Sequence, residues 1–142
     1  MTADDAATRL FIYGTLLMPA VRDAVCGRHF DTHPASLADF ARYRLRQRVY
    51  PAIVPEPGAS TAGLLCEGLD EALWRRLDQW ESELYARLAV NVQSIDGIAL
   101  AAYTYVLAPP HYHELESLPW SPAEFERLHL AAYLARWIDP SS

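Results

Sequence analysis

The stretch "LFIYGTLLMP", residues 10–19, sets the start of the fold and raises its main question. Its first four residues favour a buried strand, but Gly14 and Thr15 interrupt the apolar run before it resumes. Because glycine packs poorly in a strand, the interruption indicates either a bulge or the close approach of another group to the backbone. A glycine after a strand can also expose consecutive N–H groups, which bind a carboxylate or an oxyanion. The stretch therefore predicts either an anion-binding turn or an ordinary bulge.

Outward from this stretch, turn signals and apolar periodicity divide the chain into further elements. Asp96-Gly97 is the strongest hairpin signal, because both residues favour the tight turn between two antiparallel strands. Ser121, Pro122 and Glu124 fit the first turn of a helix as N-cap, N1 residue and capping-box partner. The predicted elements are a strand over 9–13, a helix over 19–27, a strand over 42–48, a proline-rich loop over 50–61, a strand over 61–69, a helix over 70–80, a hairpin over 85–107 and a helix over 121–137.

The proline-rich loop and the last helix carry specific expectations. Pro51, Pro55 and Pro57 lack the N–H group that a central strand needs, so they exclude such a strand from residues 50–61. Strands outnumber helices in this division, which favours an α+β protein with a small curved sheet or barrel. The inward stripe of the last helix is expected to consist of Leu130, Leu134, Trp137 and Ile138.

The composition fits one domain of 142 residues with a sizeable core. No apolar run reaches the roughly 18 residues of a membrane span, and the polar, acidic first residues are unlike a leader peptide, so we expect a cytoplasmic protein without a membrane partner. Residues 1–8 are expected to be a flexible N-terminus. Cys26 and Cys66 are expected to be reduced core residues. The formal net charge of −6 argues against a nucleic-acid partner, and the oligomeric state stays open.

Four arginines occupy alternate positions in "RYRLRQR", residues 42–48. In a strand, the arginines at 42, 44, 46 and 48 would share one face, because successive side chains of a strand point to opposite sides. Such a row is either a solvated face or a basic wall beside an anionic ligand.

Two glutamates follow the helix expected over residues 70–80, where a strand begins. A carboxyl group pressed against Trp80 would have a raised pKa, which suits a general base working near neutral pH. From position alone, Glu81 and Glu83 are both candidates. The alternatives are two solvated glutamates or an ion pair with Arg87.

Motifs for metals and cofactors are weak. His111 and His113 in "HYHE" have a chelating spacing, but no third and fourth ligands stand nearby, so we expect no metal site. The chain has no G-x-S-x-G, P-loop or dinucleotide fingerprint, so we expect no cofactor.

Four stretches in order, "FIYGTL", "YPAIVP", "GLLCEGLDEALWRRLDQWESELYARLAVNV" and "AAYTYVL", resemble the γ-glutamylcyclotransferase-like superfamily. The chain is most similar to the small branch related to plant avirulence-induced proteins and γ-glutamylamine cyclotransferase. Its stretch "LPWSPAEFERLHLAAYL" resembles the C-terminal helix of that branch. The resemblance implies an α+β fold, a small mixed β-barrel flanked by helices, formed by residues 1–142 as a single domain. It also implies an enzyme that converts a small γ-glutamyl substrate into 5-oxoproline and a free amine without a metal or cofactor.

The resemblance implies the substrate-binding residues as well. Tyr13, Gly14, Thr15 and Leu16 match the loop that holds the γ-glutamyl group through backbone groups. Tyr112 is similar in position to a tyrosine that contacts the substrate in related enzymes.

Among the two glutamates, Glu81 matches the catalytic acid/base of the family and Glu83 does not. Tyr85 and Arg87 match positions that support the site structurally. The chain departs from the family at Trp80 and Ser82, where phenylalanine and glycine are common.

Three hypotheses of different classes remain. The first is a γ-glutamyl or γ-glutamylamine cyclotransferase with one glutamate as acid/base. The second is a non-catalytic member of the same fold that binds a small ligand. The third is an interaction protein that uses the arginine row over residues 42–48.

Overall fold

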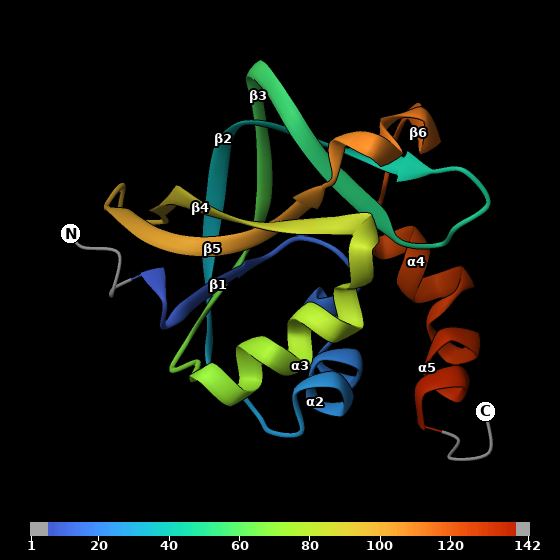
Figure 1. The fold of residues 1–142 in the computed structure, drawn as a ribbon, viewed down its shortest axis with the longest axis horizontal. Helices are drawn as coiled ribbons and strands as arrows, with labels where there is room; N and C mark the ends of the chain where they lie inside the picture. Colours follow the sequence, from blue (N-terminus) through green and yellow to red (C-terminus); the bar gives the residue numbers. More distant parts are fainter. Residues whose placement is uncertain (1–5, 139–142) are drawn as a thin grey trace.

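The structure, a computed structural model, describes residues 6–138 and consists of a β-barrel with helices below it and along one side (Figure 1). This arrangement confirms the α+β class and the small mixed barrel flanked by helices. The elements are β1 (Arg9–Ile12), η1 (Thr15–Leu17), α2 (Pro19–Cys26), β2 (Thr32–Leu45), β3 (Pro51–Glu67), α3 (Glu71–Glu81), η2 (Ser82–Leu84), β4 (Tyr85–Ser94), β5 (Ala99–Leu107), η3 (Pro109–Glu114), β6 (Leu115–Pro119), α4 (Pro122–Leu128) and α5 (Leu130–Ile138).

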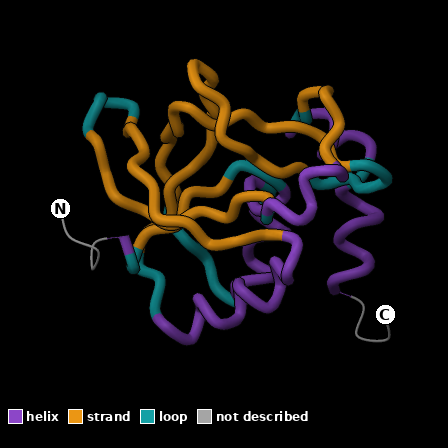
Figure 2. The backbone as a smooth tube through the Cα atoms, turned by 45° about the horizontal axis from the view of Figure 1, so that its top comes forward, coloured by secondary structure: helices purple, strands orange, loops and turns teal. Residues whose placement is uncertain are grey.

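Five strands close the barrel in the order β3-β1-β5-β4-β2, because β2 pairs with β3 as well as with β4. The pair β1–β5 is parallel and the other pairs are antiparallel, so the barrel is mixed. β6 lies outside the barrel and pairs with the end of β2. Figure 2 shows the strands gathered on one side of the molecule and the helices on the other.

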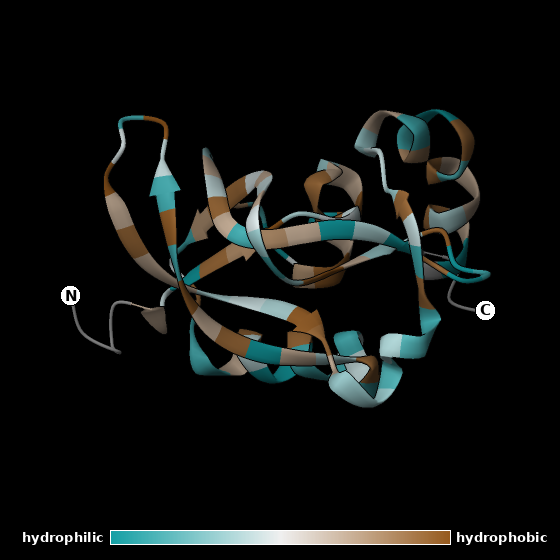
Figure 3. Cartoon of the chain, turned by 90° about the horizontal axis from the view of Figure 1, so that it is seen from above, coloured by the Kyte–Doolittle hydropathy of each residue, from teal (hydrophilic) through white to brown (hydrophobic). Residues whose placement is uncertain are grey.

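The apolar run at the start of the chain is explained by burial of both faces of β1. Leu10 and Ile12 pack in a cluster with buried residues of α2 and α3. Phe11 and Tyr13 point the other way and pack in a cluster inside the barrel. A strand that is covered on both sides has no need for polar residues at alternate positions. Figure 3 shows that the longer strands instead change between brown and teal along their length.

The proline-rich segment forms a strand, so the loop expected over residues 50–61 is wrong. β3 begins at Pro51 and runs through Pro55 and Pro57. Among the described residues, the first half of β3 pairs only with β2, while β1 pairs further along at 64–67. A strand with one free edge tolerates prolines, because their missing N–H groups can face that edge. The β2–β3 ladder also shifts register between Ala38 and Phe40, opposite this segment.

The prediction that four arginines share one face of a strand is wrong for the last two of them. β2 ends at Leu45, so Arg46 and Arg48 lie beyond the strand and do not continue the face of Arg42 and Arg44. Ion pairs join Arg44 to Glu124 at 2.7 Å and Arg48 to Glu114 at 2.7 Å. The four arginines at 42, 44, 46 and 48 therefore do not form one continuous face, whether solvated or lining a ligand.

The other helices and the hairpin follow the local signals. Gly27 ends α2 with φ 72°, and the N–H of Glu124 donates to the Ser121 hydroxyl at the start of α4. β4 and β5 pair around the turn at Asp96-Gly97. The single helix expected over 121–137 is divided at His129 into α4 and α5.

The buried face of these two helices differs from the expected stripe. Phe125 and Tyr133 are buried, and their ring centroids lie 5.5 Å apart. Leu130 and Leu134 pack against the same core but are only partly buried. The side chains of Trp137 and Ile138, the other residues of the expected stripe, lie outside the described ones.

Residues 1–5 of the expected flexible N-terminus lie outside the described residues, but residues 6–8 are attached to the rest of the chain. The indole of Trp74 donates to the Ala7 carbonyl at 2.6 Å, and the Thr8 carbonyl accepts two backbone hydrogen bonds from residues 68 and 69. Cys26 and Cys66 are free and buried, as expected. Within residues 6–138, no helix is long and apolar enough to cross a membrane.

Candidate active site

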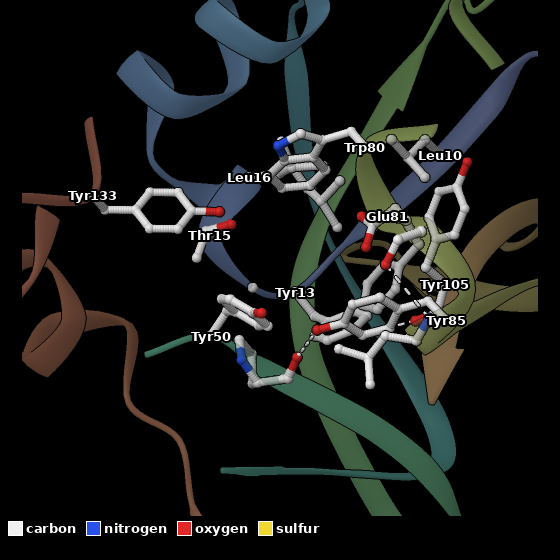
Figure 4. Close-up of a pocket in the computed structure, with 16 residues that line it drawn as sticks. Leu10, Tyr13, Thr15, Leu16, Tyr50, Trp80, Glu81, Tyr85, Tyr105 and Tyr133 are labelled. Atoms are coloured by element: carbon white, nitrogen blue, oxygen red, sulfur yellow. Dashed lines mark hydrogen bonds between the residues drawn. The ribbon is translucent and has the colours of Figure 1, made fainter. Parts of the chain in front are cut away.

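A cavity of about 110 Å³ lies where the end of β1, the start of β3 and the end of α3 meet (Figure 4). A single water needs roughly 10–15 Å³ measured in this way, so the cavity has room for several non-hydrogen atoms of a ligand. Among the described residues of its lining, Glu81 carries the one carboxyl group, and none of the others is Asp, Lys, Arg or His. Seven aromatic residues belong to the described lining: Phe11, Tyr13, Tyr50, Trp80, Tyr85, Tyr105 and Tyr133.

The structure brings most of the predicted site residues together. The cavity is lined both by the loop after β1, with Tyr13, Gly14, Thr15 and Leu16, and by Glu81 at the end of α3. These two segments lie far apart in the sequence. Figure 4 shows the Glu81 carboxyl group directed into the space between Tyr105 and Thr15. The fold joins the two segments because β1 and α3 share one core cluster.

Two predicted residues lie elsewhere. Tyr112 is in η3, 42% exposed, and is not part of the cavity lining, so its contact with a substrate stays a prediction. η3 is attached next to the end of β2, where the Arg46 N–H donates to the Glu114 carbonyl at 2.8 Å and Arg48 pairs with the Glu114 carboxylate at 2.7 Å. Glu83 is exposed and also absent from the lining, which separates it from Glu81.

The Pro51 ring lies close to Gly14. A Cβ atom at this position would lie 3.2 Å from both Cγ and Cδ of Pro51, closer than ordinary van der Waals contact. The interruption of the apolar run therefore reflects a close approach to the backbone, at the start of the strand β3.

The loop that follows β1 presents free N–H groups. The carbonyls of Gly14 and Thr15 accept hydrogen bonds from the N–H groups of Leu17 and Met18. The N–H groups of residues 14, 15 and 16 donate no hydrogen bond to any other described residue. Three consecutive residues of the cavity lining thus have unused donors, which suit a carboxylate or an oxyanion.

Glu81 is in an environment that favours the protonated carboxyl group. Desolvation by burial, and to a smaller extent the nearby Asp78 carboxylate, raise its pKa to about 8. No hydrogen bond to Glu81 is formed by residues 6–138 that would stabilise its charged form. A carboxyl group with a pKa near that of an amine can both accept and donate a proton at neutral pH.

The tyrosines around Glu81 are held neutral and in fixed positions. Burial raises the pKa of Tyr13, Tyr85 and Tyr105 above the usual value, so their hydroxyl groups stay protonated. Each hydroxyl group is also used: Tyr13 donates to the Tyr105 carbonyl, Tyr85 to the Pro51 carbonyl and Tyr105 to Asp78 Oδ1, all at 2.6 Å. The wall is therefore uncharged and rigid.

The neutral state of Glu81 predicts how stability depends on pH. In the unfolded chain its carboxyl group loses its proton near pH 4.5, whereas in the folded chain it keeps the proton to about pH 8. Between these pH values the folded state binds one proton more than the unfolded state does. The contribution of Glu81 to the free energy of unfolding is therefore largest below about pH 5 and falls as the pH rises to about 8. We expect a loss of about 4 kcal/mol across this interval. Urea unfolding between pH 5 and 8.5 measures it.

The matched control for this measurement is Glu81→Gln, which carries no titrating proton. The stability difference between the two proteins should change with pH, while the contributions of other groups cancel. Parallel pH curves for wild type and variant would contradict a neutral Glu81.

Ser82 places a strained backbone directly after the glutamate. Its φ of 62° and ψ of −169° lie in a region that is used almost only by glycine. We expect Ser82→Gly to raise the free energy of unfolding by about 1 kcal/mol, because glycine adopts this conformation without a Cβ penalty. Ser82→Ala, which loses the hydroxyl group but keeps Cβ, should give no gain. An equal gain in both variants, measured by urea unfolding, would show that strain is not the cause.

Three cavity residues have no signal in the sequence. They are Tyr50, which directly precedes β3, Tyr105 in β5 and Tyr133 in α5. Each is an aromatic residue with apolar residues beside it in the sequence. Nothing local distinguishes a tyrosine of a cavity wall from one of the core. A group of three or more His, Cys, Asp or Glu side chains fit to hold a metal ion does not occur in the described part of the chain.

Comparisons with known proteins identify the family and the fold of this chain. Residues 10–123 match the family described as "Gamma-glutamyl cyclotransferase, AIG2-like". AIG2-like protein D of Arabidopsis thaliana is 32% identical over 127 residues, which cover 88% of this chain and 83% of the relative. A solution structure of another Arabidopsis thaliana protein has a TM-score of 0.68 at 26% identity, covering 98% of this chain and 84% of that one. A structure named gamma-glutamyl cyclotransferase shares the fold, with a TM-score of 0.66 at 20% identity over 92% of this chain and 86% of its own.

Proposed function

Because the chain belongs to the γ-glutamyl cyclotransferase, AIG2-like family, we propose that it cleaves a γ-glutamyl amide to 5-oxoproline and a free amine. The observation that carries the proposal is the pairing of one partly buried carboxyl group, Glu81, with a loop whose residues have unused N–H groups and line the same cavity. The substrate supplies its own nucleophile, because its α-amine can reach its γ-carbonyl and close a five-membered ring.

In the proposed reaction, Glu81 moves the proton. The α-ammonium group of the substrate first loses one proton to solvent. The ionised form of Glu81 then accepts a second proton from the α-amino nitrogen as that nitrogen forms a bond to the γ-carbonyl carbon. The carbonyl oxygen becomes an oxyanion, and when it returns its electron pair the bond to the leaving nitrogen breaks. Glu81 donates its proton to that nitrogen, and the released amine takes up a second proton from solvent. The pKa of about 8 supports this double role, because the carboxylate is then almost as basic as the amine it serves.

The walls of the cavity support tight folding of the substrate. Ring closure requires the α-amine to come close to the γ-carbonyl carbon. In water the glutamyl chain is often extended, and these two groups are then far apart. Fixed aromatic side chains such as Tyr85 and Tyr105 restrict the space next to Glu81. Backbone N–H groups of residues 14–16 have the chemistry to hold the α-carboxylate or the oxyanion.

The proposal is tested by incubating the purified protein with γ-glutamyl dipeptides, glutathione, γ-glutamyl-ε-lysine and γ-glutamyl alkylamides. The uncharged walls are the reason to include the alkylamides, since a charged leaving group gains no ionic partner there. Mass spectrometry then measures 5-oxoproline. Release from at least one compound supports the enzyme, and its identity gives the leaving amine. Thermal stabilisation by a compound without any product would instead favour a binding protein of the same fold.

A further inference from the structure

The proposed substrate carries a negative charge that the cavity does not obviously neutralise. A γ-glutamyl group has an α-carboxylate, while the described cavity lining contains no lysine, arginine or histidine side chain. A buried carboxylate without a partner is strongly disfavoured. The unused N–H groups of residues 14–16 can bind this carboxylate without carrying a full charge, and two arginines contact the carbonyl groups of the same loop.

Arg22 lies on α2, on the outer side of the loop 13–17, and is 4% exposed. Its Nη1 donates to the carbonyls of Leu16 at 3.0 Å and Leu17 at 3.3 Å. Arg22 forms no ion pair with an acidic side chain among the described residues, and its Nε has no hydrogen-bond partner. A buried guanidinium group without a counterion is expensive to keep, and its field is weakly screened in the interior.

The two bonds from Arg22 each begin a chain of hydrogen bonds that ends at a residue of the cavity lining. In a trans peptide the C=O and N–H groups point in opposite directions, so a bound carbonyl directs the N–H of the same peptide the other way. The Leu16 carbonyl shares its peptide with the Leu17 N–H, which donates to Gly14 at 2.9 Å, and the Gly14 carbonyl shares its peptide with the free N–H of Thr15.

The second chain has the same form. The Leu17 carbonyl shares its peptide with the Met18 N–H, which donates to Thr15 at 3.0 Å. The Thr15 carbonyl shares its peptide with the free N–H of Leu16. Both unused donors are therefore reached from one guanidinium group through two peptides each, and bonds in such chains polarise one another.

Arg42 begins the third chain, from a different element. It lies on β2, and its Nη1 donates to the Tyr13 carbonyl at 2.8 Å. That carbonyl shares its peptide with the free N–H of Gly14. Like Arg22, Arg42 forms no ion pair among the described residues; its guanidinium carbon lies 5.5 Å from the ring centroid of Trp120.

We propose that Arg22 and Arg42 are positioning residues that direct the N–H groups of residues 14–16 into the cavity and supply the positive charge for recognition of a carboxylate there. The inference rests on the proposed function for the identity of that carboxylate, the α-carboxylate of the γ-glutamyl group. In this arrangement two guanidinium groups outside the cavity stabilise a bound anion without contacting it, because the peptide groups of the loop lie between them and the anion.

The test compares two small probes that differ by one carboxylate, 5-oxoproline and 2-pyrrolidinone. Their affinities are measured by NMR titration of the wild type, Arg22→Gln, Arg22→Lys, Arg42→Gln and, as a matched control, Arg28→Gln. Arg28 also donates to a backbone carbonyl, that of Gly68, but is exposed and outside the cavity lining.

We expect the wild type and the Arg28 variant to prefer 5-oxoproline, and the preference to fall about tenfold or more in Arg22→Gln and Arg42→Gln. Arg22→Lys, which keeps the charge, should retain part of it. Binding of 2-pyrrolidinone should change by less than about twofold in all variants that remain folded by thermal unfolding. If Arg22→Gln does not fold, the partly exposed Arg42 carries the test alone.

Equal loss of both probes would overturn the inference, because it would indicate general damage to the cavity. A wild type that does not distinguish the probes would overturn it as well. Failure of the proposed function is a separate result: no 5-oxoproline would form from any γ-glutamyl compound, while the preference for the carboxylate probe could still be measured.

Discussion

Replacing Glu81 with glutamine is expected to reduce the release of 5-oxoproline about a thousandfold while leaving the fold intact. Glutamine has the same shape but neither accepts nor donates the proton that the reaction moves, and general acid–base catalysis contributes about this much. The cavity already holds the neutral, protonated form of the glutamate, so an uncharged amide fits the same environment. Initial rates on the best substrate of the panel, measured by mass spectrometry, give the ratio.

Glu83→Gln is the matched control for this variant. Glu83 stands two residues further along, is exposed and does not line the cavity. Its replacement should leave the rate within about twofold of the wild type. A Glu81→Gln protein with more than a tenth of the wild-type rate would remove Glu81 from the acid/base role.

Gly63→Ala is expected to destabilise the protein by about 3 kcal/mol or more, or to prevent folding. Gly63 lies in β3 beside β1, and a Cβ atom there would overlap the Ile12 carbonyl oxygen. It would also lie 2.7 Å from Cζ of Phe11, whose side chain is among the most buried of the chain. Neither neighbour is free to move, because the backbone of β1 is paired on both sides and the Phe11 ring is packed inside the barrel. Urea unfolding measures the loss.

The control for Gly63→Ala is Gly58→Ala, in the same strand. Gly58 has φ 85°, but a Cβ atom there would meet nothing within 4 Å. Its replacement should cost about 1–2 kcal/mol through backbone strain alone. Equal losses at the two positions would contradict the close contact between β1 and β3. Because β1 also leads into the cavity loop, a Gly63→Ala protein that folds should bind 5-oxoproline more weakly.

Elements governed by neighbouring residues could be predicted from the sequence. The hairpin over 85–107 follows from Asp96-Gly97, and α4 begins where Ser121 accepts a hydrogen bond from the Glu124 N–H. The end of α2 at Gly27 has the same origin, since glycine takes the left-handed conformation that closes a helix. In each case the group that decides the structure stands within four residues of the element it ends or begins.

The errors have a common cause in distant partners. Prolines normally argue against a strand, but β3 accepts them because its first half has only β2 beside it. The last helix is divided at His129, where Phe125 and Tyr133 turn into the core in place of the leucine stripe. The arginines beyond Leu45 leave the strand, and the backbone N–H of Arg46 donates to the Glu114 carbonyl, which belongs to η3. None of these partners is visible in the local sequence.

The sequence by itself predicted a strand that ends before Gly14 and a glutamate at the end of a helix, and its resemblance to a family implied that these two segments share one site. Only the tertiary structure decided what surrounds them: the Pro51 ring against Gly14, the tyrosines that enclose Glu81, and the two arginines behind the loop. The physical reason is the range of the interactions. Turns and helix ends depend on backbone conformation and neighbouring side chains, whereas desolvation of a carboxyl group and the direction of an N–H group depend on residues that only the closed barrel brings together.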